Sequence, residues 1–298
     1  MIVGKIEYLN TKILKDFFEI TKSRLSISVV FSSITGYLLA TEIINTLHIF
    51  YLFLGGFCMV GASNTLNQVI ERNYDAVMKR TQNRPIPKGR ISISSALIIS
   101  VLMIAIGFFL LNKLNLKTAF FSFFSILVYV SIYTPLKTIT PLSVFIGAFP
   151  GAIPFMLGWV SATNKFGIEP GILFMLQFFW QFPHFWAISW VMHDDYQKAG
   201  FKMLPTGRKD SKTAFQITFY TLWMILISLI PYTHYSGSLN LTQNSALLIL
   251  ILGITMLYFS IDLMVKKTNK AASKLIIVSI FYLSLVQLIF IFDKYFLA

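Results

Sequence analysis

Nine long apolar stretches, separated by polar connections, set the pattern of the 298-residue chain. Each is about 20 residues long, which is the length that a helix needs to cross a bilayer. No polar segment is long enough to form a separate soluble domain, so we expect one all-α membrane domain over residues 1–298, with residues 1–24 as a cytoplasmic amino-terminal segment. The pattern predicts nine transmembrane helices near residues 25–45, 47–66, 93–112, 116–134, 141–161, 170–192, 214–234, 244–265 and 273–293.

The composition agrees with an integral membrane protein. Hydrophobic residues make up 56% of the chain and charged residues 12%, whereas soluble domains contain about 25% charged residues. The single cysteine, Cys58, excludes an intramolecular disulfide and a cysteine metal cluster.

Basic residues alternate between the connections as the positive-inside rule requires. All but four of the 25 lysines and arginines fall on the side of the amino terminus, and the exceptions are Lys113, Lys117, Lys165 and Lys294. We therefore expect a cytoplasmic amino terminus and an external carboxyl terminus. We expect the membrane to be a bacterial inner membrane. Topology and contact with membrane lipid explain the net charge of +13, so no nucleic-acid partner is expected.

A densely charged segment, residues 67–87, follows directly on the second apolar stretch. Asn67, Glu71, Asp75 and Lys79 lie four residues apart and form one stripe on a helix. Two carboxylates and an amide are hard oxygen donors of the kind that Mg²⁺ uses together with substrate phosphates. A solvated helix end with i,i+4 ion pairs is the alternative, but it leaves Asn67 unexplained. Basic residues that could bind phosphate oxygens follow at Arg80, Arg84, Lys88 and Arg90.

A second acidic cluster, Asp194 and Asp195, ends the sixth apolar stretch. Under the predicted topology it emerges on the same cytoplasmic side as the first cluster, so both clusters can face one cavity. Lys198 and Lys202 follow it. Ordinary helix termination remains an alternative, because aspartate favours helix ends.

Two acidic clusters surrounded by cations suit a diphosphate leaving group, whose negative charge magnesium and basic residues stabilise. The membrane setting indicates that the rest of the substrate is a long hydrocarbon chain. An allylic prenyl diphosphate meets both demands, and the active site would face the cytoplasm.

Three further residues are candidates for substrate contacts. His184 follows Pro183 inside an apolar stretch, where a histidine indicates either function or a hydrogen bond to a neighbouring helix. Tyr133 and Lys137 lie at the cytoplasmic end of the fourth stretch and could reach the diphosphate, although interfacial anchoring also explains a tyrosine there.

Several segments resemble the UbiA-type intramembrane prenyltransferases, in particular their heme-farnesylating branch, from about the first predicted helix to the seventh. Glu71 stands where the wider family usually has aspartate, and Asp194 and Asp195 are adjacent rather than four residues apart. The matching segments are NQVIERNYDAVMKRTQNRP at 67–85, YTPLK at 133–137, PGAIPFMLGW at 150–159, WQFPHFWA at 180–187 and DDYQKAGFKMLP at 194–205.

The resemblance implies transfer of a farnesyl group from farnesyl diphosphate to a vinyl group of heme B, with addition of water, to give heme O. It implies an enzyme converting heme O to heme A, or a terminal oxidase assembly, as a partner. It also implies the residue roles: Asn67, Glu71 and Asp75 hold one Mg²⁺, Asp194 and Asp195 hold a second, Lys79, Arg80, Arg84, Lys198 and Lys202 contact the diphosphate, and His184 contacts heme.

Three other functions remain open at this point. A related prenyltransferase could alkylate an aromatic quinone precursor, which needs no heme pocket. A transporter would place its charges near the midplane rather than at one membrane face. A non-catalytic heme-binding scaffold would bind heme regardless of magnesium or farnesyl diphosphate.

Overall fold

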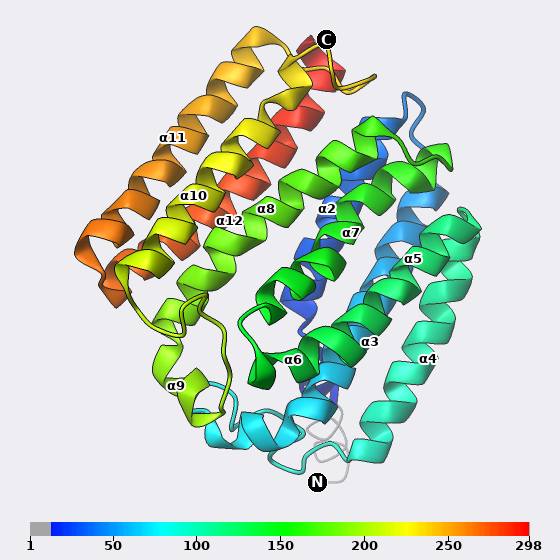
Figure 1. Ribbon diagram of the computed structural model, residues 1–298. Coiled ribbons are helices and arrows are strands. Elements are labelled where there is room, and N and C mark those ends of the chain that lie inside the picture. Colours follow the sequence, from blue (N-terminus) through cyan, green and yellow to red (C-terminus); the bar gives the residue numbers. More distant parts are fainter. Residues whose placement is uncertain (1–12, 298) are drawn as a thin grey trace, which may run out of the picture.

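The computed structural model describes residues 13–297, and its regular elements in that range are all helices (Figure 1). Lys5 and Lys12, two of the basic residues behind the predicted topology, lie outside the described residues. After a helical segment at 13–20, the long helices are α2 (Ser23–Ala40), α3 (Thr46–Val77), α4 (Ile93–Asn112), α5 (Leu116–Leu127), α7 (Ser143–Thr163), α8 (Ile168–Val191), α10 (Ser211–Ser228), α11 (Gln243–Lys266) and α12 (Asn269–Phe292).

Short helical elements link the long ones. A π-helical segment, η1 (Val128–Tyr133), and α6 (Thr134–Ile139) extend α5. The short α9 (His193–Lys198) follows α8, η2 (Ile230–Tyr232) follows α10, and η3 (Asp293–Leu297) ends the described chain.

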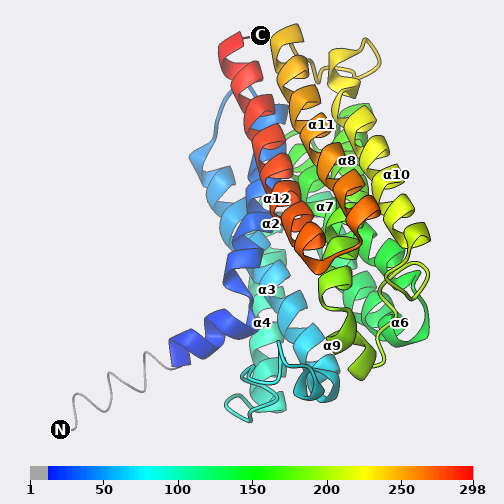
Figure 2. The same cartoon turned by 90° about the vertical axis from the view of Figure 1, so that its left-hand side faces the viewer.

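The long helices form a closed ring in chain order. Each packs against the next, from α2 and α3 through α4, α5, α7, α8, α10 and α11 to α12, and α12 returns to α2. A further contact between α2 and α7 crosses the bundle (Figures 1 and 2). The ends of α3 and α6 and the short α9 lie together at one end of this bundle (Figure 1).

Eight helical segments of the described chain are long and apolar enough to cross a membrane. The predicted span that is not among these eight is residues 170–192. It corresponds to α8, which is 24 residues long and packs between α7, α10 and α12. Its buried polar side chains, Gln177, Gln181 and His184, explain its lower hydropathy. Large apolar side chains cover the outer surface, for example Val101 and Leu102 on α4, as expected for a surface in contact with lipid.

Several helices begin at a residue whose side chain satisfies the free N–H groups of the first turn. Asn45 accepts from the N–H groups of the first turn of α3. Ser92, Asn115, Asp210 and Thr268 do the same for α4, α5, α10 and α12.

Helices α2 and α7 approach to backbone contact because both carry glycine where they cross. A Cβ atom on Gly36 would overlap the Phe155 carbonyl oxygen, and one on Gly158 would overlap the carbonyl oxygen of α2 residue Ser33. Small residues at such crossings are typical of packed membrane helices.

Prolines inside α7 free backbone carbonyl groups that must find other donors. Pro154 has no N–H for the carbonyl oxygen of Pro150, four residues earlier. The Ser125 hydroxyl of α5 donates to that oxygen at 3.2 Å. This bond ties α5 to α7 on the wall of a cavity inside the bundle.

Candidate active site

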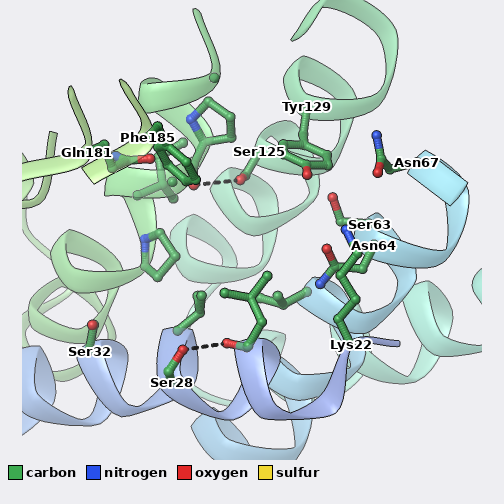
Figure 3. Close-up of a pocket in the computed structure, with 18 of the residues that line it drawn as sticks. Lys22, Ser28, Ser32, Ser63, Asn64, Asn67, Ser125, Tyr129, Gln181 and Phe185 are labelled. Carbon is green, nitrogen blue, oxygen red and sulfur yellow. Dashed lines mark hydrogen bonds between the residues drawn. The ribbon is translucent and has the colours of Figure 1, made fainter. Parts of the chain in front are cut away.

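A cavity of about 900 Å³ occupies the interior of the ring. Helices α2, α3, α5, α7, α8 and α12 and the π-helical segment η1 all contribute side chains to its wall. Figure 3 shows Asn64 and Asn67 of α3 and Tyr129 of η1 around this space. The cavity is therefore built from segments that lie far apart in the sequence.

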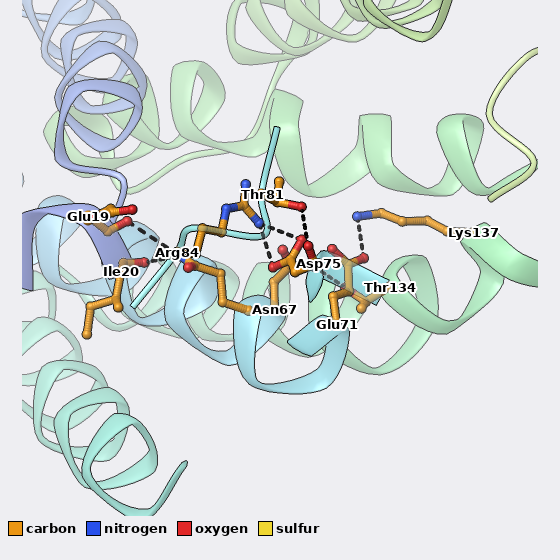
Figure 4. Close-up of polar contacts among 10 residues, drawn as sticks. Glu19, Ile20, Asn67, Glu71, Asp75, Thr81, Arg84, Thr134 and Lys137 are labelled. Atoms are coloured by element: carbon orange, nitrogen blue, oxygen red, sulfur yellow. Dashed lines mark hydrogen bonds and ion pairs between the residues drawn. The ribbon is translucent and has the colours of Figure 1, made fainter. Parts of the chain in front are cut away.

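The predicted acidic stripe lies on α3, which continues without interruption to Val77. Asn67, Glu71 and Asp75 line the cavity and are 1%, 4% and 0% exposed. Burial of two carboxylates is costly unless each has a cationic partner, and both have one (Figure 4).

Asp75 and Glu71 each form an ion pair inside the site. One terminal nitrogen of Arg84 lies 2.9 Å and 2.7 Å from the two carboxylate oxygens of Asp75. The Lys137 ammonium lies 2.7 Å from Glu71 Oε1 and 4.4 Å from the centre of the Tyr133 ring. The cations of Arg84 and Lys137 are thus held where a diphosphate would need them. In its absence, the carboxylates of Asp75 and Glu71 neutralise them.

The third member of the stripe, Asn67, is oriented by the junction of η1 and α6. Its amide nitrogen donates to Thr134 Oγ1 at 3.0 Å, and Thr134 in turn donates to the Tyr129 carbonyl oxygen at 2.8 Å. This orientation leaves the Asn67 carbonyl oxygen as the atom available to a cation. π-Helical turns often occur at functional sites, and here one positions a possible metal ligand.

The donors on this stripe fit magnesium. Within residues 13–297, no three histidine, cysteine, aspartate or glutamate side chains group together as a metal site. Mg²⁺ does not need such a cage, because it commonly binds one or two carboxylates and takes its other ligands from substrate phosphates and water. Glu71 and Asp75, with the Asn67 carbonyl oxygen, meet that requirement.

The second acidic cluster lies near the first but outside the cavity wall. Asp195 Oδ2 accepts from the backbone N–H of Arg80 at 3.2 Å, which joins α9 to the segment after α3. The Asp194 side chain is 83% exposed and lies 3.9 Å from Lys209. The assignment of a second magnesium to these two residues stays a prediction.

The predicted phosphate-binding residues divide into two groups. Arg80, Arg84, Lys137 and Tyr133 line the cavity. Lys79, Lys198 and Lys202 lie outside its wall: Lys79 is exposed, Lys198 lies 3.8 Å from Asp195, and the Lys202 ammonium donates to the Ile139 carbonyl oxygen at 3.1 Å.

One further cation of the cavity, Lys22, was counted in the sequence only as a basic residue that sets the membrane orientation. Lys22 directly precedes α2, where a lysine is typical of a membrane edge, yet in the structure it lines the cavity. Burial, together with the positive charges of Arg84 and Lys137, lowers the pKa of Lys22 from 10.5 to about 7. No pattern along the chain separates such an inward-pointing lysine from an interfacial one.

His184 also lines the cavity, and its imidazole is fixed by α12. Its Nδ1 lies 2.7 Å from Ser279 Oγ, and the Ser279 hydroxyl donates to the Ile276 carbonyl oxygen at 2.7 Å. Since a hydroxyl has one proton, Ser279 accepts from Nδ1–H, and His184 Nε2 carries the free lone pair.

A second contact holds the same ring. Trp180 stacks on His184 with ring centroids 4.6 Å apart. The Trp180 indole N–H donates to the Ser279 carbonyl oxygen at 2.7 Å. The imidazole is therefore held by Ser279 of α12 on one side and by Trp180 of its own helix, α8, on the other.

Comparison with known proteins gives a consistent result. The sequence profile of the UbiA prenyltransferase family matches residues 29–286. The chain is 56% identical over 286 residues to the protoheme IX farnesyltransferase of Christiangramia forsetii, covering 96% of this chain and 95% of that protein. It is 55% identical to the protein of that name from Flavobacterium johnsoniae, covering 94% of each.

Two solved structures share the fold. A digeranylgeranylglyceryl phosphate synthase superposes with a TM-score of 0.76 at 22% identity, over 93% of this chain and 97% of that one. A UbiA homologue from Archaeoglobus fulgidus bound to GPP and Mg²⁺ gives a TM-score of 0.69 at 12% identity, over 92% and 99%. Sequence profile, relatives and fold agree, and the chain belongs to the UbiA prenyltransferase family.

Proposed function

We propose that this protein transfers the farnesyl group of farnesyl diphosphate to a vinyl group of heme B, with hydration, to form heme O. The observation that carries the proposal is the match of nearly the whole chain, at 54–56% identity, to proteins named protoheme IX farnesyltransferase. The cavity supports it, because a buried set of carboxylates and cations and the fixed imidazole of His184 line the same space.

The diphosphate end of the donor fits the region of the acidic stripe. Lys22, Arg84 and Lys137 supply positive charge in a buried setting, where they stabilise a developing diphosphate anion more strongly than in water. Asn67, Glu71 and Asp75 would hold Mg²⁺, which when bound neutralises the charge of the leaving group. A UbiA homologue of the same fold was solved with GPP and Mg²⁺ bound, which supports a magnesium-dependent reaction.

The reaction needs no protein nucleophile. The C–O bond between farnesyl C1 and the diphosphate breaks, and its electron pair leaves with the diphosphate. The terminal carbon of the heme vinyl group bonds to C1 with its π electrons. The cation left on the inner vinyl carbon takes up water and loses a proton, which gives a hydroxyl group on that carbon. The apolar part of the cavity wall would limit the access of other water to the reactive cations.

The heme end of the cavity would lie against α8. His184 presents the unprotonated Nε2, a suitable contact for the heme iron, and Trp180 keeps the imidazole from turning. The site lies at the end of the bundle that carries the basic loops after α3 and α9, so we place it at the cytoplasmic face of a bacterial inner membrane.

The test is mass spectrometry of hemes extracted from membranes containing the protein, after incubation with heme B and farnesyl diphosphate, with Mg²⁺ or with chelator. We expect a magnesium-dependent heme heavier by one farnesyl group plus water. Unchanged heme B from folded protein, with prenylation of an added aromatic quinone precursor instead, would refute the assignment of heme as acceptor.

A further inference from the structure

One arm of the cavity runs along α3, away from the acidic stripe. The α3 residues that line it recur every three or four positions, so they share one face of the helix. This face changes from charged to polar to apolar toward the start of α3: Asp75, Glu71 and Asn67 are followed by Asn64, Ser63, Val60, Met59, Gly56 and Leu52. Such a gradient matches a ligand with an anionic head and a hydrocarbon tail.

The inner end of this arm is closed by two leucines. Leu52 of α3 and Leu111 of α4 line the cavity, are each 2% exposed, and belong to one buried apolar cluster. Leu111 packs directly on the backbone of Gly55, where an added Cβ would lie 2.9 Å from Leu111 Cγ. Backbone contact of this kind prevents the arm from extending further between α3 and α4.

The length of the arm can be measured along α3 itself. Ser63, where the polar part of the face ends, is 11 residues from Leu52, so the helix rises about 17 Å between them. An extended chain of 12 carbons, as in a farnesyl group, spans about 14 Å from its bond lengths, and a chain of 16 carbons spans about 19 Å. The shorter chain fits with its terminal methyl groups included, whereas the longer chain would meet the two leucines.

We propose that Leu52 and Leu111 form the floor of a prenyl-binding arm and limit the donor to three isoprene units. The inference rests on the proposed function only in requiring a prenyl diphosphate as donor, and it does not depend on heme as the acceptor.

The arm also contains a position at which it can be narrowed. Gly56 lines it midway, opposite Val30 of α2, and a Cβ atom on Gly56 would lie 3.1 Å from Val30 Cγ2. A side chain at Gly56 therefore intrudes on the path of the chain before the floor is reached. Substitutions at the floor and at Gly56 should change chain-length preference in opposite directions.

The experiment compares geranyl, farnesyl and geranylgeranyl diphosphates. Binding is measured by calorimetry with the unreactive thiodiphosphate analogue of each donor in the absence of heme, and turnover by competition between the donors. The variants are Leu111→Ala, Leu52→Ala and Gly56→Ala. Leu102→Ala is the matched control, because Leu102 lies on α4 like Leu111 but is 57% exposed on the outer surface.

We expect the wild type to prefer farnesyl over geranylgeranyl. Either floor variant should raise the relative affinity for geranylgeranyl about tenfold or more, the scale of discrimination by a few methylene groups in an apolar pocket. Gly56→Ala should shift preference toward geranyl, and Leu102→Ala should change nothing.

Two results would overturn the proposal. One is a wild type that binds all three analogues alike, and the other is an unchanged preference in both floor variants while farnesyl binding is retained. Because analogue binding needs no acceptor, a failure of heme farnesylation with normal chain-length selection would refute the proposed function and leave this inference standing.

Discussion

Lys137→Met separates the two roles that we assign to Lys137, which are to neutralise Glu71 without substrate and to bind the diphosphate with it. The ammonium lies 2.7 Å from Glu71, and the two side chains are 9% and 6% exposed. Methionine keeps most of the apolar stem and removes the charge. Breaking a buried ion pair from one side costs about 3–5 kcal/mol, because the remaining charge is left without a partner.

The loss of stability in Lys137→Met should depend on the magnesium concentration. In the wild type, a cation approaching Glu71 competes with Lys137, whereas in Lys137→Met it replaces the missing charge. Ligands that bind only the folded state stabilise it by an amount that grows with their affinity. We therefore expect Lys137→Met to unfold at a lower temperature than the wild type without Mg²⁺, and to recover more stability than the wild type gains when Mg²⁺ is added.

The assay is thermal unfolding of the purified protein in lipid nanodiscs across a magnesium titration, with farnesyl thiodiphosphate binding measured in parallel. Lys266→Met is the control: its partner Asp262 lies one helical turn away on α11 and the lysine side chain is 59% exposed, so little change is expected. Equal magnesium-dependent shifts in Lys137→Met and the wild type would refute the view that Lys137 and a metal compete for Glu71.

Three further substitutions test other parts of the site. Asp75→Asn should abolish turnover and destabilise the protein by leaving Arg84 partly unpaired, while membrane insertion is retained; normal turnover would refute the metal-site assignment. His184→Ala should change the absorption spectrum of bound heme, and identical spectra in the wild type and His184→Ala would exclude contact between His184 and the iron. Ser279→Ala should weaken heme binding. The pKa of Lys22 is lowered to about 7, so between pH 7 and 10.5 the unfolded chain binds more protons than the folded protein. The free energy of unfolding should therefore rise with pH across this window, relative to that of Lys22→Met. Parallel pH profiles of the two proteins would contradict the burial of the Lys22 charge.

The length of the apolar stretches predicted the helices, and the four-residue spacing predicted the stripe on α3, because both are properties of a single segment. The span at 170–192 was recognisable for the same reason, even though the polar residues of α8 reduce its hydropathy. The partners of the stripe could not be derived in this way. Glu71 and Lys137 are 66 residues apart, and their contact depends on how η1 and α6 pack against α3.

The sequence also left undetermined the direction in which charged side chains at the helix ends point. Lys22 and Asp194 both lie at helix ends on the same face of the membrane, where charged residues usually meet water. The structure turns Lys22 into the cavity and leaves Asp194 exposed beside Lys209. Such differences depend on the angle at which the chain enters a helix, and no local pattern encodes that angle.

Apart from the exposed Arg80, the charges of the site described above balance both with and without ligands. Without ligands, Arg84 and Lys137 neutralise Asp75 and Glu71, and burial favours the neutral form of Lys22. A prenyl diphosphate carries about three negative charges near neutral pH, and one Mg²⁺ offsets two of them. Protonation of Lys22 would supply the third positive charge, since a nearby anion raises the pKa of a lysine. Diphosphate binding at pH 8 should therefore take up about one proton per site, which calorimetry in buffers of different ionisation enthalpy measures directly. A binding enthalpy independent of the buffer would show that Lys22 does not complete this balance.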